Sequence, residues 1–309
     1  MANSELDQTT APDTALAPHR FGHVAIVGRP NVGKSTLLNR MLGQKLSITA
    51  GKPQTTRHSI LGILSEPEMQ IAFIDTPGLH QGQFAKINKL MNQQALNALE
   101  EADHVIMVIE ALKFTDEDSY VLERLKNVSS PVSLVVNKVD LAKRREELLP
   151  FLERIQNQRE FRHIWLLSAR TGSGAGSMKR ELTAALPLGL SVYPEDEITD
   201  RSGRFLAAEF VREQLVRHLG QELPYATTVE IERFQEDGNL TRIHAVIWVE
   251  RDGQKAIVVG EGGSMLKKVG TNARLNLEKL LECKVFLELW VKVKASWSND
   301  DRALKRFGY

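Results

Sequence analysis

The feature that most constrains this chain is a short apolar run that feeds directly into a glycine-rich loop. Residues 23–27 have the length of a buried parallel strand, and the loop that follows contains Gly28, four further residues and Gly33-Lys34-Ser35. Apolar residues then recur at helical spacing, at Leu37, Leu38, Met41 and Leu42. A strand, a glycine loop and a helix in this order predict a phosphate-binding loop.

The chemistry of this loop follows from its backbone and its two polar side chains. Glycines let backbone N–H groups converge on a phosphate, and the helix N-terminus adds its positive end. Lys34 can reach the outer phosphates, and the Ser35 hydroxyl suits Mg²⁺. The alternative is a glycine turn that opens an ordinary helix. We expect nucleotide contacts from Gly28, Arg29, Pro30, Asn31, Val32, Gly33, Lys34, Ser35 and Thr36.

A second motif, Asp75-Thr76-Pro77-Gly78, ends the apolar run 71–74. Asp75 can hold Mg²⁺ through water, and the Gly78 N–H can meet a γ-phosphate. The alternative is a plain strand-end turn. Leu79, also expected at the nucleotide, stands where Ras-like enzymes carry the glutamine that orients the attacking water. Leucine has no donor or acceptor, so we expect slow intrinsic hydrolysis, unless a polar neighbour such as His80 replaces the glutamine.

Two further motifs predict base recognition, and each follows an apolar strand. Asn137-Lys138-Val139-Asp140 comes after residues 132–136, and Ser168-Ala169 ends a second run. The Asp140 carboxylate can accept from two adjacent donors, which guanine presents and adenine does not. Asn137 and Lys138 would order the loop and cover the ring, and the Ala169 N–H would lie near guanine O6. Each motif alone is weak, since a polar turn is its alternative.

Together the four motifs, in this order and each after a strand, predict a Mg²⁺-dependent GTPase that converts GTP to GDP. Helical patterns separate the strands at about residues 84–101, 116–127, 143–158 and 176–186. This alternation is typical of a doubly wound α/β domain, with ligands at the carboxyl ends of its strands.

Length and composition favour two domains. The chain has 309 residues, 40 basic and 39 acidic side chains, so any nucleic-acid surface must be local. Its one cysteine, Cys283, excludes an intrachain disulfide and fits a reducing, cytoplasmic setting. We expect a disordered tail at 1–20, a GTPase domain at 21–188, a linker at 189–202 and a second domain at 203–309.

The second half has a different pattern. A helix is expected near 205–219, then two strands around an Asp237-Gly238-Asn239 turn, a loop Gly260-Glu261-Gly262-Gly263, a helix to about Glu282, and a strand 285–293. In that last strand every second residue is apolar and is expected to face the domain interior: Val285, Leu287, Leu289, Val291 and Val293. Helix–strand–strand–helix–helix–strand with a Gly-x-x-Gly loop predicts an α+β type II KH domain.

RNA binding is the expected chemistry of this second domain. From Lys255 onward we count eleven basic residues against six acidic ones. The alternative is a glycine turn beside a solvated lysine face. Trp248 and Trp290 are expected to pack on the neighbouring domain or linker in preference to stacking on bases. The expected RNA contacts are Gly260, Glu261, Gly262, Gly263, Lys267 and Lys268.

The chain resembles the Era family of GTPases over about residues 21–309. The resemblance lies in the phosphate loop, in Pro53-Gln-Thr-Thr-Arg57, in the motif 75–79 and in Glu288-Leu-Trp-Val-Lys-Val-Lys294. It implies GTP and GDP binding with Mg²⁺, and binding to the 3′ end of 16S ribosomal RNA in 30S subunit assembly. It also implies a cytoplasmic protein, partly associated with the inner membrane, and we expect a monomer.

Three points stay open at this stage. Ser35 and Asp75 are expected at Mg²⁺, and either Thr55 or Thr56 joins them when the γ-phosphate is bound; we favour Thr56, with Lys34 and Gly78 as the other catalytic groups. Glu261 is an acid at a position where many KH loops carry lysine. Lys267 and Lys268 would offset its negative charge. In the alternative function, a GTPase of tRNA modification or of membrane-associated cell-cycle control, the second domain would be a protein-interaction module.

Overall fold

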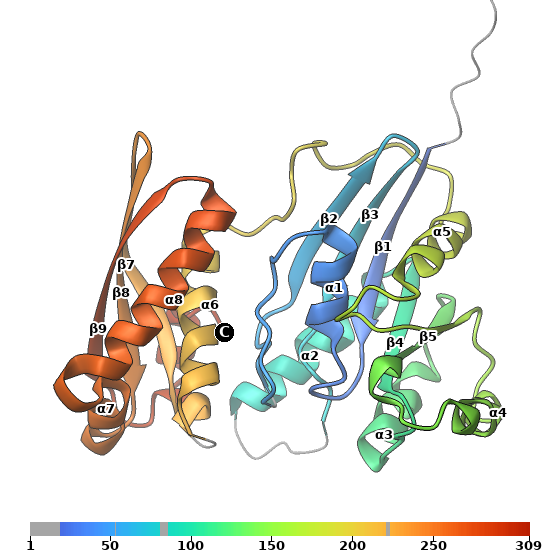
Figure 1. Ribbon diagram of the computed structural model, residues 1–309, viewed down its shortest axis with the longest axis horizontal. Helices are drawn as coiled ribbons and strands as arrows, with labels where there is room; N and C mark the ends of the chain where they lie inside the picture. The colour runs from blue at the N-terminus through green and yellow to red at the C-terminus, as the bar shows by residue number, and fades with distance from the viewer. Residues whose placement is uncertain (1–18, 53, 81–85, 221–222) are drawn as a thin grey trace, which may run out of the picture.

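The computed structural model describes residues 19–309 except 53, 81–85 and 221–222 (Figure 1). Most of the predicted tail, Pro53 of the 53–57 motif and the start of the predicted helix 84–101 therefore lie outside the described residues. The two predicted domains are present as two separate sheets, one of six strands and one of three.

The first domain is built on a sheet with strand order β2-β3-β1-β4-β5-β6. Its strands are β1 (Arg20–Val27), β2 (Ile60–Glu66), β3 (Met69–Asp75), β4 (His104–Glu110), β5 (Val132–Asn137) and β6 (Ile164–Leu166). All neighbours pair in parallel except β2, which runs antiparallel to β3. The predicted doubly wound α/β architecture is confirmed, and the antiparallel edge strand is an addition to it.

Helices cover both faces of this sheet, because the central strands are apolar on both sides. The helices are α1 (Lys34–Leu42), α2 (Lys86–Glu101), α3 (Asp116–Leu125), α4 (Leu148–Gln156) and α5 (Ala175–Ala185). Side chains of α1 and α5 share one buried cluster, and those of α2, α3 and α4 share another. The loops that follow β1, β3 and β5 therefore meet at the carboxyl edge of the sheet.

The second domain has the predicted type II KH order. Its elements are α6 (Gly203–His218), β7 (Thr228–Asp237), β8 (Leu240–Val249), α7 (Asp252–Val259), α8 (Ser264–Leu281) and β9 (Lys284–Val293). The sheet order is β7-β8-β9, with β8 antiparallel to β7 and parallel to β9. The inward alternation of β9 ends early: Val293 is 36% exposed, because it is the last residue of its strand.

The C-terminal segment, including α9 (Asp301–Arg306), corrects the expected surroundings of Trp248. That side chain packs on Phe307 and donates from Nε1 to Glu230, so it is covered by its own domain's end and not by the first domain or the linker. Trp290 is 55% exposed. Trp297, Ala303 and Leu304 instead cluster with Ile87 and Met91 of α2 and fasten the chain end to the first domain.

The two domains also share a hydrophobic core, which is centred on α6. Leu46, Ile48 and Ile60 of the first domain belong to the same buried cluster as Phe210 and Leu215 of α6. Figure 1 shows the segment between α1 and β2 lying alongside α6. Buried residues run around the whole circumference of α6 from Leu206 to Val216, so this helix faces both domains.

Candidate functional site

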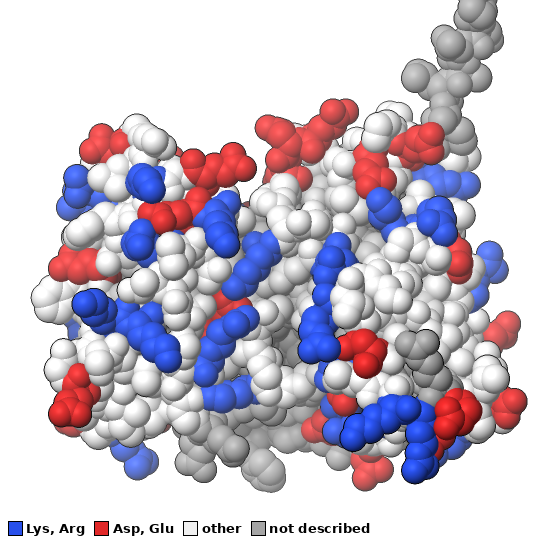
Figure 2. All heavy atoms as spheres, viewed as in Figure 1, with Lys and Arg blue, Asp and Glu red and all other residues white. Residues whose placement is uncertain are grey.

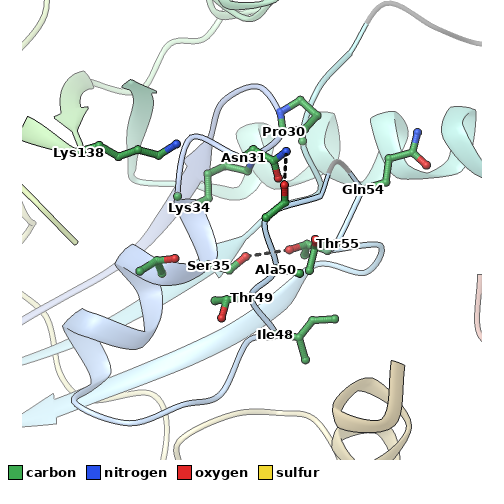
Figure 3. A pocket seen from close by; sticks show the side chains of 15 residues that line it. Pro30, Asn31, Lys34, Ser35, Ile48, Thr49, Ala50, Gln54, Thr55 and Lys138 are labelled. Atoms are coloured by element: carbon green, nitrogen blue, oxygen red, sulfur yellow. Dashed lines mark hydrogen bonds between the residues drawn. The ribbon is translucent and has the colours of Figure 1, made fainter. Parts of the chain in front are cut away.

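The strand-end loops of the first domain enclose a pocket of about 290 Å³. Figure 3 shows the loop carrying Lys34 and Ser35 opposite the segment carrying Thr49 and Thr55. The Lys138 side chain also reaches this pocket. Three of the four predicted motifs therefore contribute to its wall.

The phosphate loop is a tight curl around the Lys34 ammonium group. Lys34 Nζ donates to the carbonyls of Gly28 and Arg29, each at 3.0 Å. Burial lowers the pKa of Lys34 to about 8. Gly28 has φ +153°, and a Cβ there would lie 2.4 Å from the Val108 carbonyl oxygen, so no other residue fits. The curl leaves the N–H groups of the loop to face a ligand.

Hard oxygen donors gather beside this loop. Ser35 Oγ lies 2.8 Å from Thr56 Oγ1, whereas Thr55 Oγ1 donates to the Lys52 carbonyl at 2.7 Å. Asp75 is fully buried; its Oδ2 accepts from Ser47 Oγ at 2.7 Å, and its Oδ1 has no partner within the described residues. Burial raises the pKa of Asp75. Hydroxyl and carboxylate oxygens are the ligands that Mg²⁺ prefers, and Asp75 Oδ1 still lacks a partner in the part of the chain that the structure describes. A bound Mg²⁺ would lower the pKa of Asp75 again, because it stabilises the charged carboxylate.

Asn137 joins three segments at the base end of the pocket. Its Nδ2 donates to the Val32 carbonyl at 2.8 Å, and its Oδ1 accepts from the Lys138 and Ala169 N–H groups at 2.8 and 2.9 Å. The Ala169 N–H is therefore engaged inside the protein and not left pointing at a base. Asp140 pairs with Arg170 at 2.6 Å, and a hydrogen bond from Ser168 helps lower the pKa of its carboxyl group.

Several supporting residues, Asp118, Glu110 and Ser47, had no sequence signal. The buried Asp118 carboxylate accepts from Arg29 Nε at 2.9 Å, so the Arg29 side chain, expected at the nucleotide, is turned into the protein. Glu110 accepts from Lys138 Nζ at 2.7 Å and orients the stem that would cover a base. Ser47 lies in a segment without a motif. Only its hydrogen bond with Asp75, 28 residues away, reveals its place in the site.

Leu79 and His80 are both buried. Leu79, expected at the nucleotide, is 1% exposed and packs in the core with Val27 and Ile74. His80 is 9% exposed; its Nδ1 lies 3.0 Å from the Gly78 carbonyl oxygen and its Nε2 lies 3.5 Å from Gln54 Nε2. Neither side chain is free to place a water by itself.

The Gly-x-x-Gly loop of the second domain adopts left-handed backbone at two of its glycines. Gly262 and Gly263 have φ +57° and +80°, and a Cβ on either would meet nothing within 4 Å. Behind the loop lies a groove of about 430 Å³ between α8 and β9. The groove is lined by Gly263, Leu266, Lys267, Gly270, Thr271, Arg274, Leu287, Glu288 and Leu289.

Only one of the two predicted lysines lines this groove. Lys267 lines it, whereas Lys268 lies outside its wall, and Arg274 is a basic wall residue that sequence reasoning did not single out. Glu261 is exposed at the loop. Lys and Arg side chains gather over α8 and along the junction between the domains (Figure 2).

A phosphate loop, a cluster of oxygen donors that fits Mg²⁺ and the Asn137–Asp140 loop on one side, with a type II KH fold on the other, define a two-domain P-loop GTPase. The model of the 50S ribosome-binding GTPase family matches residues 23–138, and the KH domain model matches residues 222–298. GTPase Era of Stenotrophomonas maltophilia (strain R551-3) is 54% identical over 292 residues, which cover 94% of this chain and 98% of the relative. The chain belongs to the Era family of GTPases.

Other relatives agree with this assignment. GTPase Era of Xanthomonas campestris pv. campestris (strain B100) is 54% identical, covering 95% of this chain and 98% of the relative. The solved structure of Era with MgGDPNP and nucleotides 1506–1542 of 16S ribosomal RNA is similar with a TM-score of 0.91 and 37% identity, covering 94% of this chain and 99% of that one. An Aquifex aeolicus Era variant bound to GDP·AlF4⁻ has a TM-score of 0.90 at the same identity and the same coverage. Within the described residues, no helix is long and apolar enough to cross a membrane.

The base-recognition loop makes a first testable prediction. Asp140→Asn replaces one acceptor by a donor, and xanthine presents an acceptor where guanine has its amino group. The ratio of GTP to XTP affinity should therefore fall at least about tenfold, because a site loses much of its discrimination when a hydrogen bond to the base is reversed. Competition binding at fixed Mg²⁺ measures it. An unchanged ratio would show that Asp140 does not contact the base.

Proposed function

We propose that this chain couples GTP hydrolysis in its first domain to the binding of the 3′ segment of 16S ribosomal RNA by its second domain, in assembly of the 30S subunit. The observation that carries the first half is that Lys34, Ser35 and Thr56 line one pocket, while Lys34 and Ser35 also interact with the buried Asp75 carboxylate behind it. For the second half, the support is the α8–β9 groove, with a similar fold that holds nucleotides 1506–1542 of 16S ribosomal RNA.

The roles proposed for the nucleotide site follow from its contacts. Lys34 would exchange its two carbonyl partners for β- and γ-phosphate oxygens. Ser35 would hold Mg²⁺ directly, Asp75 through water, and Thr56 only when the γ-phosphate is present. A bound Mg²⁺ would neutralise the charge that develops on the phosphates. The Gly78 N–H would meet the γ-phosphate, and its lack of a Cβ lets it approach Pro30.

Hydrolysis should be slow in the absence of a partner. Positioning and charge stabilisation supply most of the catalysis in phosphoryl transfer. Buried Leu79 cannot contribute to the positioning of water. We therefore propose that the attacking water is placed by backbone groups or by the RNA-bound state. Family membership extends the proposal to a cytoplasmic monomer with peripheral contact to the inner membrane, which fractionation and sedimentation would test.

Neighbouring threonines offer a matched test of the metal site. Ser35→Ala should weaken both Mg-GTP and Mg-GDP binding by about tenfold or more, because it removes a direct ligand. Thr56→Ala should slow single-turnover GTP hydrolysis by about tenfold or more and leave GDP affinity within about twofold. Thr55→Ala is the control, since its hydroxyl is used within the loop, and it should behave like the parent chain. Equal effects of the two threonine variants would contradict the assignment of Thr56.

The Gly-x-x-Gly loop offers a second matched test. Replacing Gly262 and Gly263 together by Asp places negative charge where RNA phosphates are expected, whereas replacing both by Asn gives the same shape and the same left-handed strain without charge. The Asp variant should bind an RNA of the 1506–1542 sequence at least about tenfold more weakly than the Asn variant at physiological salt, with GTP affinity unchanged in both. Equal RNA affinity of the two variants would show that no phosphate lies at this loop, as the protein-interaction alternative requires.

A further inference from the structure

Helix α6 of the second domain holds the segment between α1 and β2 along its length. The fully buried Glu213 accepts from the Thr49 N–H at 3.0 Å and pairs with Lys45 Nζ. Arg217 Nη2 donates to the Thr49 carbonyl at 2.8 Å, and Lys52 Nζ donates to the Leu219 carbonyl just past the helix. The segment that ends in Thr56 is thus attached to another domain at successive points.

The last of these attachments is Arg212. Its Nη2 donates to the Thr55 carbonyl at 2.5 Å, and the side chain is 1% exposed. The same guanidinium group forms two hydrogen bonds with Glu209, from Nε at 2.7 Å and from Nη2 at 2.6 Å. A planar guanidinium gripped at two points by a buried carboxylate has one orientation available. Glu209 therefore aims Arg212 at Thr55.

This contact acts on the peptide unit that carries Thr56. The Thr55 carbonyl and the Thr56 N–H belong to one planar trans peptide, so they point in opposite directions. With the carbonyl directed at α6, the Thr56 N–H is directed away from α6. The Thr56 hydroxyl lies 2.8 Å from Ser35 Oγ, and both residues line the nucleotide pocket.

We propose that Arg212 is a positioning residue for GTP hydrolysis, supplied to the GTPase site by the KH domain. It orients the Thr55–Thr56 peptide so that the Thr56 hydroxyl and N–H are presented to Mg²⁺ and the γ-phosphate. This inference rests on the role proposed for Thr56. It makes α6 part of the nucleotide site, so a ligand that shifts α6 would change the hydrolysis rate without touching the nucleotide.

A merely structural role for the Arg212–Glu209 pair leads to a different expectation. A buried pair at a domain junction that only stabilised the fold would, when removed, lower the melting temperature and weaken GDP and GTP binding together. A positioning role affects the γ-phosphate-dependent steps and spares GDP, because the Thr56 contact is made only with the triphosphate.

The experiment uses the full chain and four variants. Glu209→Leu with Arg212→Met removes the pair without leaving an unpaired buried charge. Arg212→Lys keeps the charge beside Glu209, but its side chain is one bond shorter and cannot hold both partners. Arg204→Met is the control on α6, since Arg204 donates to the Ile231 and Glu232 carbonyls of β7 and not to the α1–β2 segment. Thr56→Ala tests the role on which the inference rests.

The readouts are the single-turnover rate, the Mg²⁺ concentration for half-maximal rate, GDP affinity and melting temperature. The Glu209/Arg212 double variant should hydrolyse GTP about tenfold more slowly or worse and need more Mg²⁺, with GDP affinity within about twofold. Arg212→Lys should share the slow rate at a melting temperature near that of the parent chain, and Arg204→Met should match the parent in rate, Mg²⁺ requirement and GDP affinity.

Three results separate the possible failures. If Thr56→Ala is slow and either Arg212 variant retains the parental rate, the inference is overturned. If Thr56→Ala itself retains the parental rate, the role proposed for Thr56 fails, and the inference fails with it. Should the double variant not fold, Arg212→Lys decides alone, because it preserves the ion pair.

Discussion

The attachment of the nucleotide site to the second domain depends first on the burial of Leu46 and Ile48. These side chains of the α1–β2 segment are 1% and 0% exposed, and they pack into the core that α6 builds with the KH sheet. Burial of an aliphatic side chain of this size contributes about 1.5–3 kcal/mol. The segment runs from the phosphate-binding helix α1 to Thr56. Its middle is therefore held by the KH domain, while its two ends lie at the nucleotide site of the GTPase domain.

This arrangement relates the nucleotide site to the second domain through short paths. Ser47, between the two buried residues, donates to Asp75 at 2.7 Å, while Arg212 holds the peptide before Thr56. Asp75 and Thr56, the two Mg²⁺ ligands proposed outside the phosphate loop, are therefore both attached to the α1–β2 segment. Because Leu79, the residue after Gly78, is buried in the core, the groups that act at the γ-phosphate are positioned mainly by the α1–β2 segment.

The parts predicted from sequence are those in which local chemistry determines residue type. The phosphate loop needs glycine at position 28, because a Cβ there would collide with a neighbouring carbonyl. The order of elements in the KH domain follows from the spacing of apolar residues and from the turn residues between them. The rest depends on contacts between distant residues: Arg212 and Thr55 are 157 positions apart, and in sequence Arg212 is an ordinary basic residue of a predicted helix. The same reason explains the buried His80 and the engaged Ala169 N–H. No local pattern shows that another segment covers or binds these groups.

The central claim is that the α1–β2 segment couples the nucleotide site to the RNA-binding domain, and thermodynamic linkage between the two ligands tests it most directly. The affinity of the 1506–1542 RNA would be measured with the chain free, bound to Mg-GDP and bound to a nonhydrolysable Mg-GTP analogue, and the analogue's affinity would be measured with and without RNA. We predict that the analogue changes RNA affinity by at least about fivefold relative to the free chain, and that RNA changes analogue affinity by the same factor. Identical RNA affinities in all three states would contradict the account.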